Sequence, residues 1–185
     1  LSRGLGDVYK RQALERQMAQ NGLLIQSNRI AALKKISSAQ ENSTTTFPIA
    51  ELSLSKTNGD LTTDEDEFVK ALSENRQLDV MAGRTLIGPH RSDMEATYKE
   101  KGISAKDSST GEQKAMLISI VLANARALKL ELGYPPVILL DEISAHLDID
   151  RRGALYQEIN ALGAQAWMTG TAVSYTHLTL PTKVT

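Results

Sequence analysis

The stretch PVILLDEISAHLD, residues 136–148, places four branched aliphatic side chains directly before two carboxylates. A short apolar run that follows two prolines predicts a strand of a parallel sheet, covered on both faces. Asp141 and Glu142 then stand where this strand leaves the sheet. Ligands of open α/β sheets bind at the carboxyl ends of the strands, so these two acids are candidates for chemistry. Taken alone, the pattern also fits a plain exposed strand end.

Helix and strand patterns alternate around this strand. Residues 109–133 predict a buried helix that opens with a capping box of Ser109 and Glu112 and ends at a glycine. Asp148 can cap a following helix, which also ends at a glycine, and QAWMT is the next predicted strand. This order predicts a doubly wound α/β lobe with a mostly parallel sheet flanked by helices.

The residues before this lobe predict a helical arm and a returning strand. Apolar residues recur at near-helical spacing over residues 13–38 and predict one long amphipathic helix. Residues 50–55 alternate in polarity and predict a half-exposed strand, which Asn58-Gly59 closes like a hairpin turn. The apolar positions of the predicted helix are Leu14, Met18, Ile25, Leu33 and Ile36.

A second helix is predicted to begin after Thr63. Four acids fall in its first turn, where they complement the helix dipole, so we assign them no metal site. Leu61 is placed to pack on Phe68 across the start of the helix. After Gly83, short strands are predicted at RTLIGPH, 94–98 and 103–105, which could form a small antiparallel patch.

Charge and composition limit the possible functions. The net charge of −1 gives no overall attraction to nucleic acid, so a DNA contact would have to be a local patch. The chain has no cysteine, which excludes disulfides and thiolate metal sites. The longest apolar run, 115–123, is far shorter than the roughly 20 residues of a membrane span. We therefore expect a soluble, cytoplasmic protein.

Three stretches taken together resemble the ATP-binding-cassette ATPases, and among them most closely the RecF family, which is related to the Rad50 and SMC heads. The stretches are GRTLIGPHRSDM, STGEQKAMLISIVLANAR and PVILLDEISAHLD. Within them, VILLDE resembles a Walker B strand, STGEQK a signature sequence and SAHLD a D-loop, in the family's order. The resemblance covers roughly Ala13 to Thr171.

The resemblance implies roles for single residues. Asp141 would hold Mg²⁺, and Glu142 would be the catalytic base that orients and deprotonates the attacking water. The start of the signature helix would grip the γ-phosphate of an ATP bound on the opposite subunit, with the D-loop beside it. The nucleotide-binding residues implied in this way are Ser109, Thr110, Gly111, Glu112, Ser144 and Asp148.

The resemblance also divides the chain into four parts. Residues 13–83 would be the later part of a helical arm with its returning strand, and residues 84–173 the C-terminal lobe of an ATPase head. The end segments 1–12 and 174–185 resemble translated sequencing-adaptor sequence. We expect both ends to be non-native and the natural protein to continue beyond them.

The implied function is that of a weak ATPase in DNA replication, recombination, repair and the SOS response. Such a protein would recognise gapped DNA, dimerise on ATP and support RecA loading together with RecO and RecR. An SMC- or Rad50-like structural clamp and, less favoured, a transporter nucleotide-binding subunit are the alternatives. No GxxxxGK[ST] motif occurs. The isolated chain is therefore expected neither to bind nor to hydrolyse ATP appreciably.

Several further residues remain open to two interpretations. Thr169 is followed by Gly170 rather than by the switch histidine of many cassette ATPases, which puts phosphate sensing at this position in doubt. Histidines and basic residues could face nucleotide, a partner subunit or DNA, or they could be local hydrogen-bonding and solvated groups. These residues are His90, Arg91, His146, Lys34, Lys35, Arg151 and Arg152.

Overall fold

The computed structural model describes residues 2–43, 45–55, 62–142 and 147–169. Helices and strands alternate along the chain, with two 3₁₀ turns between them. In chain order they are α1 (Ser2–Glu41), β1 (Ala50–Leu54), α2 (Glu65–Ala82), η1 (Pro89–Arg91), β2 (Met94–Tyr98), β3 (Ile103–Ser104), η2 (Ala105–Asp107), α3 (Thr110–Leu132), β4 (Ile138–Leu140), α4 (Ile149–Leu162) and β5 (Ala166–Met168).

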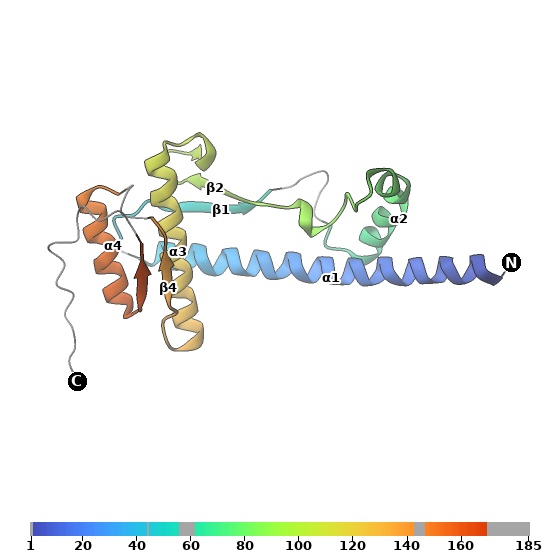
Figure 1. The fold of residues 1–185 in the computed structure, drawn as a ribbon, viewed down its shortest axis with the longest axis horizontal. Helices are drawn as coiled ribbons and strands as arrows, with labels where there is room; N and C mark the ends of the chain where they lie inside the picture. Colours follow the sequence, from blue (N-terminus) through green and yellow to red (C-terminus); the bar gives the residue numbers. More distant parts are fainter. Residues whose placement is uncertain (1, 44, 56–61, 143–146, 170–185) are drawn as a thin grey trace.

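The molecule is elongated along α1, and the other elements gather at two places on this helix (Figure 1). Helix α2 packs beside the N-terminal half of α1, where Ala19 contacts Phe68 and Leu72 in a small core. Helices α3 and α4 lie with β4 and β5 at the other end, in a larger α/β lobe (Figure 1). Strands β1 and β2 run alongside α1 between the two places (Figure 1).

The α/β lobe is built on a parallel pair of strands. Strand β4 pairs with β5 in the register Ile138 with Ala166, Leu139 with Trp167 and Leu140 with Met168. The predicted helix–strand order and the parallel pairing are confirmed, but the prediction that β4 is covered on both faces is wrong. Ile138 and Leu140 are buried, whereas Leu139 is 74% exposed. The reason is that Ile138 and Leu140 point toward α3 in the core of the lobe, whereas Leu139 points to the opposite face of the pair.

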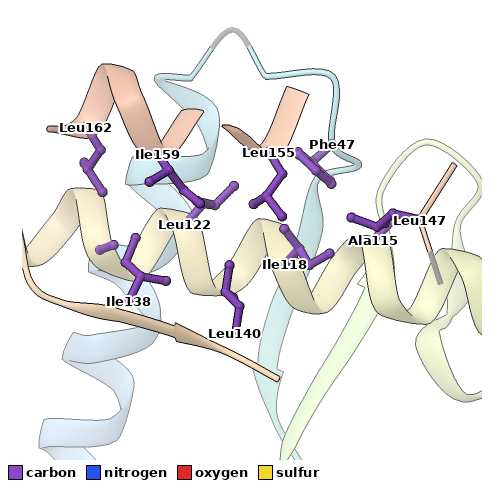
Figure 2. Close-up of a cluster of buried hydrophobic side chains, with 11 residues drawn as sticks. Phe47, Ala115, Ile118, Leu122, Ile138, Leu140, Leu147, Leu155, Ile159 and Leu162 are labelled. Atoms are coloured by element: carbon purple, nitrogen blue, oxygen red, sulfur yellow. The ribbon is translucent and has the colours of Figure 1, made fainter. Parts of the chain in front are cut away.

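The core of this lobe lies between α3, α4 and the inward face of β4. Figure 2 shows Leu155, Ile159 and Leu162 of α4 meeting α3, and Ile138 and Leu140 of β4 lying on the side of α3 away from α4. Helix α3 is buried over its middle, as its apolar sequence predicts. The capping box of Ser109 and Glu112 and the glycine stops of α3 and α4 form as predicted.

The predicted antiparallel patch forms in part: β2 and β3 pair, and β1, rather than RTLIGPH, completes a three-stranded sheet in the order β1, β2, β3. It pairs Ala50 with Tyr98 and Leu54 with Met94. The predicted strand at RTLIGPH is wrong, because these residues form a loop that ends in η1. The amide of Leu86 donates to Asp79 Oδ1 of α2 instead of to a strand neighbour, and Pro89 opens η1 without an N–H.

Helix α1 corrects two predictions. It begins at Ser2, so residues 2–12, which lack helical periodicity, are helical together with the predicted segment. The predicted apolar packing face is wrong over its first part, where Leu14, Met18 and Ile25 are exposed by 58%, 43% and 43%, whereas Leu33 and Ile36 are half-buried. The buried positions in this part of the helix are Glu15, Ala19, Gly22 and Gln26.

Close packing of α2 explains this shift of the buried face. An ideal Cβ on Gly22 would lie 2.7 Å from Cε1 of Phe68, so only glycine lets the two helices approach this closely. Glu15 is buried because its carboxylate receives two hydrogen bonds from Arg76, at 2.5 Å from Nε and 2.6 Å from Nη2. This carboxylate raises the pKa of the Arg76 guanidinium, chiefly through the hydrogen bond.

The start of α2 differs from the prediction by one residue. Asp64, rather than Thr63, is the N-cap, and its Oδ1 accepts the amide of Glu67 at 2.9 Å. An aspartate cap satisfies a free amide of the first turn and adds negative charge at the positive end of the dipole. The acidic first turn therefore has the structural role predicted for it. Leu61 and the Asn58-Gly59 turn lie outside the described residues.

Candidate functional site

Asp141 and Glu142 lie at the carboxyl end of β4, and both are exposed. The backbone amide of Thr169 donates to Leu140 O at 3.0 Å, which brings the ends of β4 and β5 level. The Thr169 hydroxyl donates to Asp141 Oδ1 and accepts the amide of Glu142 at 3.0 Å. Two acids at an exposed strand end are thus held to the neighbouring strand by one side chain.

Glu142 also has an unusual backbone. Its φ of 50° makes it the one non-glycine residue with positive φ in the part of the chain that the structure describes. This left-handed conformation costs about 1–2 kcal/mol for a residue with a Cβ. The hydrogen bond from its amide to Thr169 offsets part of that cost. The chain therefore turns sharply out of the strand directly after Asp141.

The start of α3 is the second part of the candidate site. Ser109 Oγ donates to Glu112 Oε2 at 2.7 Å, and the Ser109 amide donates to the same oxygen at 2.9 Å. The ammonium of Lys101, from the turn between β2 and β3, also binds the Glu112 carboxylate. Lys101 first, and then Ser109, hold the pKa of the Glu112 carboxyl at about 2.

The first residues of α3 and its N-cap are open to solvent. Ser109 and Thr110 are exposed, and a Cβ built on Gly111 would meet no atom within 4 Å. The described part of the chain therefore gives no steric reason for glycine at this position. A helix start with free amides and no side chain at Gly111 can bind an anion through its backbone.

The two parts lie toward the same end of the α/β lobe. In the core, Leu140 at the end of β4 packs beside Ile118, and Leu147 packs beside Ala115 in the second turn of α3 (Figure 2). Leu147 lies just after residues 143–146, which are outside the described residues together with the candidates Ser144 and His146. Asp148 is described and caps α4, with Oδ1 accepting the Arg151 amide at 2.8 Å.

The other candidates have local partners in several cases. His90 Nε2 lies 2.8 Å from Thr85 O. This is a local hydrogen bond, the alternative to a contact with nucleotide or DNA. Lys35 pairs with Glu131 at 2.7 Å. Arg151 Nε lies 3.8 Å from Oδ2 of Asp148, three residues earlier in the chain, so the charge of Arg151 is also partly neutralised. Lys34 is exposed, and Arg91 and Arg152 are half-buried.

Thr169 and Lys101 were not predicted as site residues from the sequence. Thr169 follows the last residue of a correctly predicted strand, so its place beside Asp141 could have been inferred once β4 and β5 were paired. Lys101 gives no such signal, because its contact with Glu112 depends on how the β2–β3 turn folds over α3. Pairing of separate elements, rather than any local motif, brings both residues to the site.

The described residues carry neither a metal-binding cluster of acidic, histidine or cysteine side chains nor a membrane-spanning helix. No group of three or more His, Cys, Asp or Glu side chains is arranged there to hold a metal ion. Among the same residues, none of the helices has both the length and the hydrophobicity that crossing a bilayer requires.

Comparison with known proteins identifies what these elements are similar to. The chain is 45% identical over 166 residues to the DNA replication and repair protein RecF of Rhizobium meliloti, matching 86% of this chain and 44% of that protein. It is 43% identical over 178 residues to RecF of Agrobacterium fabrum, matching 92% of this chain and 47% of that protein. The chain is a partial RecF homologue. No protein-family model matches it.

Solved RecF structures support the same assignment at the level of the fold. The structure described as the recombination mediator protein RecF-ATP in the RecFOR pathway superposes with a TM-score of 0.67 at 22% identity. The match covers 88% of this chain and 45% of the RecF chain. The RecF-like chain therefore spans about half the length of the relatives it matches, and the RecF resemblance predicted from its motifs is confirmed.

Proposed function

We propose that this RecF-like chain is part of an ATP-dependent DNA-binding protein of recombination and repair, and that its α/β lobe is the C-terminal lobe of an ATP-binding-cassette ATPase head. The observation that carries the proposal is the acid pair Asp141–Glu142, fixed at the carboxyl end of a parallel strand by Thr169. Homology to RecF supports it, as does the fold shared with the RecF-ATP structure.

The acid pair has the chemistry that phosphoryl transfer requires. Asp141 would hold Mg²⁺, and it fits this ion as a single exposed carboxylate, because Mg²⁺ takes most of its remaining ligands from water and phosphate. When bound, Mg²⁺ neutralises charge on the transferring phosphoryl group. Glu142 would orient the attacking water and accept its proton, which its exposure at the strand end allows.

The start of α3 would bind the γ-phosphate of an ATP held by a second copy. The free amides of the first turn and the positive end of the helix dipole favour an anion there. No described atom lies within 4 Å of a Cβ built on Gly111. A phosphate that approaches the backbone at this position would account for the glycine. Ser109, Thr110 and Gly111 would make this contact, Glu112 would hold the helix start in shape, and Ser144 and Asp148 would lie at the interface.

The uncovered sheet face supports assignment to half of a larger head. Leu139 and Trp167 are paired neighbours on β4 and β5 and are 74% and 62% exposed. The chain spans less than half the length of the RecF proteins that it matches. We infer that the remainder of a RecF-like protein, including a phosphate-binding loop, covers this face. Residues 13–83 would then be the arm and residues 84–173 the lobe.

The biological role proposed is binding at gapped DNA in the cytoplasm, with ATP-driven dimerisation, in support of RecA loading together with RecR and RecO. The homologous structure is of a recombination mediator in the RecFOR pathway, which supports this role. Lys34 and Lys35 are proposed DNA contacts. The affinity for gapped DNA is measured at several salt concentrations. In the double variant Lys34→Ala, Lys35→Ala the plot of log binding constant against log salt concentration should be flatter, because each lost phosphate contact lowers its slope.

A Rad50- or SMC-like clamp is the second candidate. The observation that favours it is the length of α1, which runs unbroken from Ser2 to Glu41, with 29 residues after the end segment 1–12. Such a clamp requires long heptad helices joined to the head, whereas α2 folds back on α1 through Phe68 and the Glu15–Arg76 pair. Electron microscopy of the complete protein separates the two, because a clamp would show a long paired arm.

The proposed function is tested with Glu142→Gln in the complete protein. Loss of the base should slow ATP hydrolysis and trap an ATP-bound dimer, seen by size-exclusion chromatography with light scattering. Glu95→Gln, an exposed acid on β2, is the matched control and should behave as wild type. Unchanged turnover in Glu142→Gln would show that Glu142 is not the base.

The 185-residue chain itself provides a second test. Since it contains no GxxxxGK[ST] motif, we propose that it has no appreciable affinity for ATP on its own. Isothermal titration calorimetry with Mg-ATP measures this directly. Micromolar binding by the chain alone would contradict a nucleotide site that is shared with the rest of the protein.

A further inference from the structure

The hydroxyl of Thr169 is placed between both members of the acid pair. Strands β4 and β5 are parallel, with Leu140 opposite Met168. Asp141, which follows β4, therefore lies beside Thr169, which follows β5. The amide of Thr169 extends this pairing through its bond to Leu140 O at 3.0 Å. The position of Thr169 is therefore set by the sheet itself and not by a loop.

Both hydrogen-bonding functions of the hydroxyl are used. Its hydrogen is donated to Asp141 Oδ1, and its oxygen accepts the amide of Glu142 at 3.0 Å. A hydroxyl has one donor and two acceptor sites, so one side chain can hold a carboxylate and a neighbouring amide together. The bond to Asp141 is made to Oδ1, so the Thr169 hydroxyl does not itself occupy Oδ2, the oxygen that would face a metal ion.

The backbone of Glu142 depends on the same hydroxyl. Its φ of 50° lies in the left-handed region, which residues with a Cβ rarely adopt without supporting contacts. The amide of Glu142 has the Thr169 hydroxyl as its partner at the exposed end of the strand. Removing the hydroxyl would release this conformation and with it the direction in which Glu142 leaves the strand.

We propose that Thr169 is a positioning residue of the acid pair: its hydroxyl orients the Asp141 carboxylate toward a metal ion and fixes the left-handed turn at Glu142. This inference rests on the proposed function for the role of the pair, but the positioning itself is a property of the chain. Supporting partners of metal ligands act in this way, and their loss lowers metal affinity or activity by roughly 10–100-fold.

The first experiment uses the 185-residue chain and needs no nucleotide. Thr169→Val keeps the shape and removes the hydroxyl, whereas Thr169→Ser keeps the hydroxyl. Amide hydrogen exchange followed by NMR should show exchange at Glu142 at least about tenfold faster in Thr169→Val and near wild type in Thr169→Ser, since only the former removes the acceptor. Unchanged exchange at Glu142 in Thr169→Val would overturn the inference.

The second experiment uses the complete protein and measures the Mg²⁺ concentration for half-maximal ATP-driven dimerisation. Thr169→Val should raise it by about 10–100-fold, and Thr169→Ser should restore it. If Thr169→Val exchanges faster at Glu142 yet leaves the Mg²⁺ requirement unchanged, the hydroxyl is only structural and the inference is wrong. If Glu142→Gln also fails to trap a dimer, the proposed function fails, while the exchange result still decides the positioning.

Discussion

Gln40, in the last turn of α1, pairs with the backbone of Ala50 as a neighbouring strand would. Its Nε2 donates to Ala50 O at 2.9 Å, and its Oε1 accepts the Ala50 amide at 2.9 Å. The same Oε1 accepts the hydroxyl of Ser119 from α3 at 3.2 Å. Gln40 and Ser119 are each 2% exposed, so one amide joins α1, the antiparallel sheet and the α/β lobe in a buried network.

Gln40→Leu should therefore destabilise the fold by about 2–4 kcal/mol. The substitution leaves the buried amide and carbonyl of Ala50 without partners, and each unsatisfied group costs about 1–3 kcal/mol. Urea denaturation followed by circular dichroism measures the loss. Gln12→Leu, on an exposed position of the same helix, is the control and should change stability by less than about 0.5 kcal/mol. Equal stability of the two variants would contradict the network.

Gly22→Ala should lower stability although alanine is the better helix former. The added Cβ would lie 2.7 Å from Phe68 Cε1 and 3.2 Å from its Cζ, within the packed contact of α1 and α2. Overpacking costs about 1–3 kcal/mol, whereas the gain in helix propensity is at most about 1 kcal/mol. We expect a net loss of about 1 kcal/mol in thermal or urea unfolding.

Gly153→Ala is the matched control for this test. Gly153 is also in a helix, and a Cβ there would meet no atom within 4 Å. Stability should rise by up to about 1 kcal/mol, because only the propensity term changes. If Gly22→Ala is stabilising to the same degree as Gly153→Ala, α1 and α2 do not pack as closely as described.

The contrast between α3 and α1 shows which parts of the fold the sequence could predict. The limits of α3 follow from local chemistry: Ser109 and Glu112 satisfy the first amides, and Gly133 adopts the left-handed conformation that ends the helix. The buried face of α1 is not a local property. It is decided by Phe68 and Arg76 of α2, which require a small residue at Gly22 and a carboxylate at Glu15.

The candidate site divides in the same way. Asp141 and Glu142 could be predicted because an apolar strand that ends in acids is a local pattern. Thr169 belongs to no local pattern, because its role follows only once β4 and β5 are paired in register. The exposure of Leu139 was also missed, since a run of aliphatic residues does not show which elements will cover each face.

The Glu112 carboxyl predicts a pH dependence in the acid range. Its folded pKa of about 2 is below the ordinary value of 4.5 for a glutamate carboxyl, because Lys101 and Ser109 bind the charged form. A carboxyl with a lowered folded pKa contributes stability above its unfolded pKa and loses it as pH falls through the folded one. The midpoint temperature of thermal unfolding should therefore decrease as the pH is lowered from about 5 to about 2. This part of the decrease should be absent in Glu112→Gln.

NMR titration of the Glu112 carboxyl measures the shift directly. Lys101→Met should move its pKa upward from about 2, since Lys101 is the largest cause of the lowering. Lys101→Arg keeps the positive charge and serves as the control. A midpoint near 4.5 in the wild-type chain would show that the Lys101–Glu112 pair does not persist in solution.

Trp167 predicts a difference between the isolated chain and a complete RecF-like protein. It is the single tryptophan of the chain, lies opposite Leu139 on the uncovered sheet face and is 62% exposed. Fluorescence of the isolated chain should show the long-wavelength emission of a hydrated indole and strong quenching by iodide.

Burial of this face by further strands or helices removes water from the ring. In the complete protein, a variant in which Trp167 is the only tryptophan should therefore emit at shorter wavelength and resist quenching. Emission that is already short in wavelength and unquenched in the isolated chain would contradict an open face on β4 and β5.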